Sequence, residues 1–219
     1  MLKPVSLSFF ALVFGGCAAK TATPEAVPAV AVEAESAPTS KASAVTAADV
    51  QWSPIYPDRP EGPQISLLAG NPKEGSFSAL VKLPAGAAGE LHTHPSTFHG
   101  VVVAGTIKNG RTAEESAKLE VGDIWTQPGE EAHFTGCTED ADCIFAGRME
   151  GAMKTENVDT PADASTQTVV VAADIDFKPL TPEQPDGPKL FVVSGDMKTG
   201  PWTAVATFPA GLTTPLHSH

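Results

Sequence analysis

A gapless internal repeat constrains the fold of this chain more than any other feature of its sequence. Residues 45–94 align with residues 170–219 at an offset of 125, with 19 identities in 50 positions. Two stretches that match over this length without a gap are expected to share a backbone conformation. The first copy therefore defines a complete domain over residues 45–169, whereas the second copy, 170–219, contains only the first part of such a domain.

The shortness of the second copy has two interpretations. The chain can be a fragment of a longer two-domain protein, which is the simpler interpretation. Alternatively, the half unit completes the sheet of the first domain or pairs with a second copy of the chain. A half barrel exposes strand edges and an apolar face, which favours association. A second copy of the chain is therefore one expected partner, in a homo-oligomer.

Short apolar stretches between glycine and proline turns predict an all-β fold. The chain contains 19 glycines and 20 prolines. Residues 76–83 alternate between polar and apolar side chains, residues 100–104 form a continuous apolar run, and Lys108-Asn-Gly-Arg111 is a hairpin signal. Strands at this spacing with no helical pattern between them indicate a sandwich or a barrel.

The first 17 residues resemble a secretory signal peptide that ends in a bacterial lipobox. Lys3 precedes the apolar run 5–14, which is too short to span a membrane, and Gly15-Gly16-Cys17 follows. The resemblance implies cleavage before Cys17 and lipidation of that cysteine, with Ala18 favouring the periplasmic face of an outer membrane. Ordinary cleavage a few residues later is the alternative. Residues 18–44, rich in Ala, Thr and Pro, are predicted to form a disordered tether.

The charge of the chain argues against nucleic acid as a partner. Its formal net charge is −12, and no cluster of Lys or Arg occurs in the sequence. Binding to phosphates requires such clusters. We therefore expect no nucleic-acid partner, and contact with a membrane only through the lipid anchor.

The six histidines are confined to two places in the sequence. Four lie between positions 92 and 133, and His217 and His219 stand where the repeat places a second copy of His92 and His94. His92 and His94 are two residues apart, so on a strand they point to the same face, and His133 follows from a later strand. Three imidazoles meeting inside a barrel predict a metal site; the alternative is that they pack without metal.

Two cysteines remain after the expected processing. Cys137 and Cys143 flank an acidic, turn-like segment, so they can face each other across a hairpin. An exported protein permits a disulfide there, which is the favoured interpretation. Alternatively, Cys137 is a thiol near the metal.

The stretch from Gly86 to Cys137 resembles the two motifs of the cupin superfamily. The first motif is matched by Gly86-x5-His92-x-His94 with Gly105 as its closing glycine, and the second by Gly122-x5-Pro128-x4-His133. Glu130 replaces the inner glycine of the second motif, and Cys137 replaces its asparagine. The resemblance implies a cupin jelly-roll barrel, a double-stranded β-helix. The chain is most similar to a bacterial family of duplicated cupins of unknown function, and more distantly to the cupin domains of anti-sigma factors.

The resemblance implies that His92, His94 and His133 are metal ligands. The usual acidic ligand is missing: counting three residues on from His94 places Phe98 in its position, and counting four places His99 there. His99 is favoured as a fourth ligand, with a position beside the ligands or in the pocket as the alternative. Glu130 and Glu131, beside His133, are interpreted as a solvated turn, with groups that support the ligands as the alternative.

Histidine ligands without a carboxylate suit Fe, Zn, Ni or Cu better than Mg or Ca. Three-histidine iron cupins include an acetylacetone-cleaving dioxygenase, so the resemblance implies that oxygen-using enzyme chemistry does not require the carboxylate. The sequence therefore leads to a cupin lipoprotein that binds a divalent transition metal. It either acts on a small molecule as an oxygenase or hydrolase, or binds or senses a metal or small ligand in the cell envelope without catalysis. A third interpretation is that the fold is kept with no metal bound.

Overall fold

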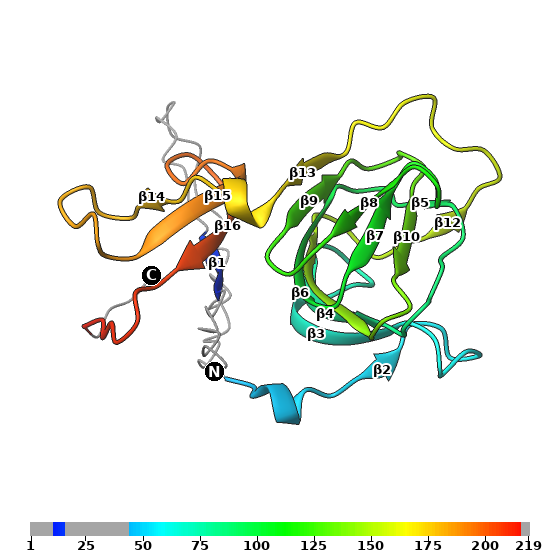
Figure 1. Cartoon of the computed structure of the whole chain (residues 1–219), viewed down its shortest axis with the longest axis horizontal. Helices are drawn as coiled ribbons and strands as arrows, with labels where there is room; N and C mark the ends of the chain where they lie inside the picture. Colours follow the sequence, from blue (N-terminus) through cyan, green and yellow to red (C-terminus); the bar gives the residue numbers. More distant parts are fainter. Residues whose placement is uncertain (1–10, 16–43, 216–219) are drawn as a thin grey trace, which may run out of the picture. The chain divides into compact units, whose positions relative to one another are not determined.

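The computed structural model describes residues 11–15 and 44–215 of the chain, and it divides them between two compact units. One unit is Val45–Ile175; the other combines the N-terminal segment with Asp176–His219. Strands dominate both units (Figure 1), beside two 3-10 helices, η1 (Ala47–Asp49) and η2 (Ala172–Asp174). Neither of these helices has the length or apolar character needed to cross a membrane.

The Val45–Ile175 unit is built on a seven-stranded antiparallel sheet. Neighbouring strands pair in the order β13-β9-β6-β11-β4-β3-β2. The alternating apolar pattern of residues 76–83 becomes β4, which lies between β3 and β11. The bounds of these strands are β2 (Ser53–Pro54), β3 (Gln64–Gly70), β4 (Phe77–Leu83), β6 (Phe98–Ala104), β9 (Ile124–Gln127), β11 (Cys143–Met149) and β13 (Thr168–Val170).

A second group of strands forms the other layer of this unit (Figure 1). It contains the sheet β10-β7-β8 and the pair β12-β5. Single β-bridges at Ala88–Gly136 and His92–His133 connect the segment around β5 to the segment around β10. Two antiparallel layers joined in this way form a jelly roll, which confirms the all-β cupin fold expected from the sequence. The strands are β5 (His92–Thr93), β7 (Ile107–Gly110), β8 (Ser116–Leu119), β10 (Phe134–Cys137) and β12 (Glu156–Asn157).

Three aromatic rings pack together at the centre of the barrel. Phe98, Trp125 and Phe145 meet edge to face, with ring centroids 5.2 to 5.7 Å apart. Trp125 is fully buried, and aliphatic side chains from both layers complete the cluster. Removing this much aromatic surface from water stabilises the barrel.

Cys137 and Cys143 form a disulfide in the structure. Both side chains are buried, and the bond links the end of β10 to the start of β11. The sulfur of Cys137 is therefore engaged in this bond, and the alternative of a thiol beside a metal does not apply to it. Because the cysteines are only six residues apart, the bond restricts little of the unfolded chain and its stabilising effect is modest.

Residues 172–207 repeat the opening of the Val45–Ile175 unit, and from Asp176 on they belong to the second unit. The helix η2 and the strands β14 (Lys178–Pro179) and β15 (Lys189–Gly195) begin and end 125 residues after η1, β2 and β3. The sheet of the second unit has the order β1-β16-β15-β14, completed by β16 (Trp202–Thr207) and β1 (Ala11–Gly15). β1 falls within the expected signal peptide, whereas Cys17, the tether up to residue 43, His217 and His219 lie outside the described residues.

Gly100 gives a direct test of the packing around Trp125. A Cβ atom at this position would lie 2.3 Å from two ring atoms of Trp125. We predict that Gly100→Ala lowers the free energy of unfolding by about 1–3 kcal/mol, because the fully buried indole has to move. Urea denaturation measures the loss. Gly75→Ala, where an added Cβ would meet no atom within 4 Å, is the control and should change stability far less; equal losses in both variants would contradict this account of the core.

Candidate metal site

Backbone pairing brings two of the three motif histidines together. His92 begins β5 and His133 immediately precedes β10. The His92 N–H donates to the His133 carbonyl at 3.0 Å, and the His133 N–H donates to the His92 carbonyl at 2.9 Å. His94 lies two residues further along the same extended segment, and its carbonyl accepts a 2.7 Å bond from the Glu130 N–H. All three side chains therefore reach one face of the barrel wall.

The three imidazoles form a tight cluster. The ring centroids of His92 and His133 are 4.3 Å apart, and His94 lies 4.9 Å from the first and 5.3 Å from the second. One nitrogen from each ring lies within 4.8 Å of the other two. Nitrogen atoms at this separation can bind a single ion placed between them.

The hydrogen bonds of the rings determine which nitrogen is available. Each Nδ1 contacts a backbone carbonyl oxygen: His92 that of Glu90 at 2.8 Å, His94 that of Lys154 at 2.9 Å, and His133 that of Glu131 at 3.0 Å. A carbonyl oxygen only accepts, so Nδ1 carries the hydrogen in all three rings. Nε2 of each neutral ring then keeps its lone pair, as in histidines that bind metals.

The surroundings keep the three rings uncharged at neutral pH. Burial lowers the pKa of His92, and burial together with the nearby His92 lowers that of His94. Burial is also the largest cause that lowers the pKa of His133 to about 3. A metal ion binds neutral imidazole, so no proton has to be displaced at pH 7.

A cavity of about 650 Å³ opens beside the three imidazoles. Its walls are mostly apolar and come from both layers of the barrel, and its volume matches that of sites for small organic molecules. Apart from the histidines, the polar side chains in its lining are those of Tyr56, Arg59, Glu90, Thr135, Thr155 and Asn157.

The structure does not bring His99 to the other three histidines, which corrects the expected fourth ligand. Phe98 faces the interior, where it contacts Trp125 and lines the cavity. Side chains alternate along β6, so His99 points to the opposite face of the sheet. There its Nδ1 lies 2.9 Å from Oγ1 of Thr126 and its Nε2 lies 3.1 Å from Oε1 of Glu150. Phe98 therefore occupies the position of the usual acidic ligand.

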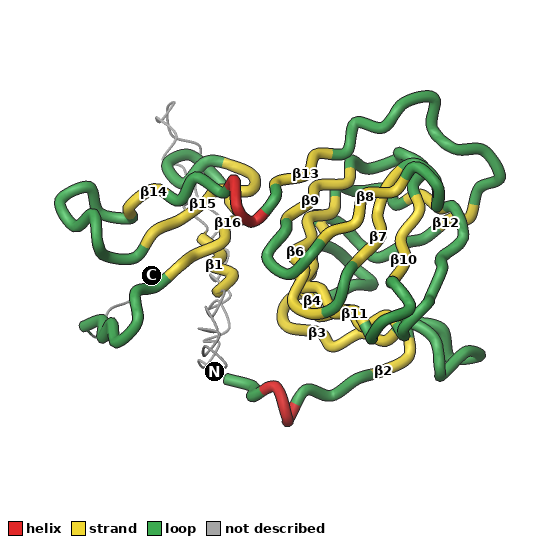
Figure 2. Tube along the Cα trace, viewed as in Figure 1, coloured by secondary structure: helices red, strands yellow, loops and turns green. Residues whose placement is uncertain are grey.

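Glu131 contacts the cluster through its backbone carbonyl, which accepts a hydrogen bond from Nδ1 of His133, so it follows the alternative of a group that supports the ligands. Its carboxylate accepts hydrogen bonds from Ser165 and Thr166, at the end of the long loop between β12 and β13 (Figure 2). Burial works to raise the pKa of Glu131, but the bonds from Thr166 and Ser165 outweigh it and lower the pKa. Its neighbour Glu130 has a φ of 62°, in the left-handed region that favours the glycine it replaces.

Sequence reasoning missed the residues that line the cavity outside the motifs. Tyr56 and Arg59 stand in a proline-rich loop between β2 and β3, where no spacing pattern marks them. Lys154 supplies the acceptor for His94, and Thr155 lines the cavity, from a segment that follows β11. A backbone carbonyl leaves no mark in the sequence, so this acceptor could not have been found there.

The lowered pKa of His133 predicts an acid-sensitive metal-free protein. In the unfolded chain His133 takes up a proton below about pH 6.5, whereas the folded protein resists this down to about pH 3. The unfolded state therefore binds more protons in this window, and stability falls as the pH is lowered. Each pH unit costs up to about 1.4 kcal/mol for such a histidine. Urea denaturation of metal-free protein between pH 7 and 5 measures the slope.

The His133→Gln variant provides the comparison for this measurement. It removes the titrating group, so its stability should depend less steeply on pH than that of the wild type. Identical slopes for the two proteins between pH 7 and 5 would show that His133 is not the buried neutral group described here.

Comparison with solved structures finds cupins and cupin-like enzymes. KdgF from a Halomonas species is 22% identical, with 50% of this chain and 94% of that chain covered and a TM-score of 0.40. An RmlC-like cupin from Ralstonia eutropha JMP134 is 19% identical, covering 53% of this chain and 80% of its own, with a TM-score of 0.43. The DMSP lyase DddQ from Ruegeria pomeroyi DSS-3 is 23% identical, covering 52% and 62%, with a TM-score of 0.41.

At these identities the similarity concerns the fold, and no activity is transferred from these proteins. No protein of curated function matches the sequence. A family model, described as a domain of unknown function (DUF4437), matches residues 27–156. This range is more than half of the chain and includes all three clustered histidines. The chain therefore belongs to the DUF4437 family.

Proposed function

We propose that the Val45–Ile175 barrel binds one divalent transition-metal ion through His92, His94 and His133, and uses it to act on a small molecule in the adjoining cavity. One observation carries this proposal. Three Nδ1–H groups donate to backbone carbonyls, which leaves the Nε2 lone pair of each ring available, and the three rings cluster beside a cavity. Packing alone does not require all three rings to share this tautomer.

The donor set fits Fe, Zn, Ni or Cu. Neutral imidazoles suit these ions, whereas Mg and Ca prefer oxygen ligands. When bound, such an ion supplies a Lewis acid and a site for water, dioxygen or substrate. Phe98 brings no further ligand from the position where an acid would stand, so the cavity side remains accessible to a small molecule. The apolar walls exclude water from it. We infer oxygen-using or hydrolytic chemistry on this basis.

A non-catalytic binding module is the second candidate, and one observation favours it. Among the described residues that line the cavity, Glu90 is the single carboxylate, and it accepts a hydrogen bond from the Asn157 amide. A general base has to be free to take a proton from its substrate. A site without such a base is suited to hold a metal and a ligand without converting them.

We propose further that the protein is anchored in the bacterial envelope through a lipid on Cys17, facing the periplasm. Lys3, the apolar run 5–14 and the small residues before Cys17 support this proposal, and Ala18 supports sorting to the outer membrane. The Ala- and Pro-rich stretch 18–44 would then act as the tether. A disulfide between Cys137 and Cys143 is compatible with that oxidising compartment.

Metal content tests the proposed site. The chain, purified without an affinity tag, is expected to contain one Fe, Zn, Ni or Cu ion per molecule by elemental analysis. The double variant His92→Ala/His133→Ala removes two of the three ligands and should retain less than about a tenth of that metal.

The matched control for the metal measurement is His99→Gln. This histidine is also buried, but both of its ring nitrogens have partners outside the cluster. The variant should keep the full metal content. A wild type that takes up none of the four ions, or a His99→Gln variant that loses its metal as the double variant does, would contradict the site.

Detergent partitioning tests the anchor. In bacteria, wild-type protein is expected in the detergent phase, with lipid on Cys17 detected by mass spectrometry of the N-terminal peptide. A Cys17→Ser variant lacks the sulfur that carries the lipid and should move to the aqueous phase. Wild-type protein cleaved after residue 17 and carrying no lipid would refute the anchor.

A further inference from the structure

The positive charge of an ion at the proposed metal site has to be balanced by a bound ligand. The three histidines are neutral, and Phe98 stands where a cupin usually places a carboxylate. A divalent ion bound there keeps both of its positive charges. In a cavity with apolar walls, an uncompensated charge is costly, so an anionic ligand would bind with a large electrostatic advantage.

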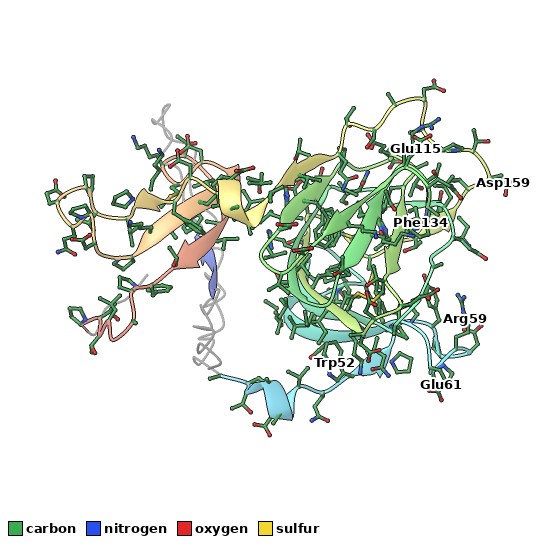
Figure 3. The ribbon with its side chains drawn as sticks, in the orientation of Figure 1. Trp52, Arg59, Glu61, Glu115, Phe134 and Asp159 are labelled. Atoms are coloured by element: carbon green, nitrogen blue, oxygen red, sulfur yellow. A yellow bond between two sulfur atoms is a disulfide. The ribbon has the colours of Figure 1, made fainter. Side chains whose placement is uncertain are left out.

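Arg59 adds a further positive charge to the same cavity. It lies at the rim of the barrel, on the loop between β2 and β3 (Figure 3), and it lines the cavity together with Tyr56. Its guanidinium carbon lies 4.4 Å from the centroid of the Tyr56 ring. Stacking on the ring restricts the guanidinium and leaves its N–H groups free to donate. Among the described residues, Arg59 makes no ion pair with a carboxylate.

Few negatively charged side chains are found among the described residues that line the cavity. Glu90 is the single carboxylate among the described lining residues, and it is hydrogen-bonded to Asn157. With a divalent ion bound, the lining therefore carries positive charge in excess. Most of the remaining wall is aliphatic or aromatic, and it includes Ile65, Val81, Leu83, Phe145, Met149 and Met153.

We propose that the cavity selects small organic carboxylates with an apolar body, and that Arg59 is the residue that binds the carboxylate. This proposal rests on the proposed metal function, because most of the excess charge belongs to the ion. Guanidinium and carboxylate match in geometry and form paired charge-assisted hydrogen bonds. The apolar part of the molecule then packs against the aliphatic and aromatic walls of the same cavity.

Calorimetric titration of the zinc-loaded full chain tests the proposal. The probes are phenylacetate and hexanoate, each compared with its neutral amide, phenylacetamide or hexanamide. Each pair has nearly the same shape, so a difference in affinity reports the charge. We expect at least one carboxylate to bind about tenfold or more tightly than its amide. Arg59→Gln should weaken that binding about tenfold, while zinc content stays that of the wild type.

Lys82→Gln is the matched control. The Lys82 ammonium also lies over an aromatic ring, 4.9 Å from the centroid of Trp52, but this lysine does not line the cavity. The variant should bind the carboxylates as the wild type does. Equal affinity for carboxylates and amides, no measurable binding of either, or full carboxylate affinity in Arg59→Gln would each overturn the proposal.

The failure of the metal site can be told apart from the failure of the anion site. If the wild type takes up none of the four ions, the metal proposal fails by itself, and the same titrations are made on metal-free protein. Binding of a carboxylate that still depends on Arg59 would support the anion site alone. Its absence would overturn the anion site as well.

Discussion

Two backbone hydrogen bonds between His92 and His133 hold the arrangement on which the candidate site depends. They join the segment around β5 to the segment before β10, and so connect the two parts of the second layer of the barrel. With this bridge in place, the pleat turns both side chains toward the cavity and brings His94 with them. Three carbonyl oxygens then fix the tautomer of each ring. The backbone therefore determines both the position and the protonation of the metal-binding atoms.

Because Phe98 takes the position of the usual acidic ligand, the packing of β6 also determines the charge of the proposed metal site. With Phe98 pointing inward, the cluster has three neutral donors and a hydrophobic side chain beside them. The barrel gains apolar packing around Trp125, and the charge of a bound ion is left for a ligand to balance. Arg59 then adds to the positive charge of the cavity instead of offsetting that of the ion. The same substitution thus explains why the start of β6 brings no fourth ligand to the three histidines, and why an anion is the proposed ligand.

The fold and the clustering of three histidines could be predicted from the sequence, because strand spacing marks His92 and His94 and the resemblance to the cupin motifs adds His133. The pair His92 and His94 follows from the two-residue period of a strand, and glycines and prolines mark the turns between strands. His99 could not be placed, because Pro95 and Ser96 interrupt the strand and hide the side-chain register. Arg59 and the carbonyl of Lys154 reach the site from a loop and a short irregular segment. Their positions depend on tertiary structure alone.

Anomalous X-ray diffraction from crystals of the metal-loaded protein, recorded at the absorption edge of the metal, shows whether the three histidines bind one ion. One anomalous peak is expected at about 2.0–2.1 Å from the Nε2 atoms of His92, His94 and His133. At least one coordination position should face the cavity and hold water or a small ligand. A peak at His99, coordination through Nδ1, or a fourth protein ligand that closes the site would contradict the proposed site.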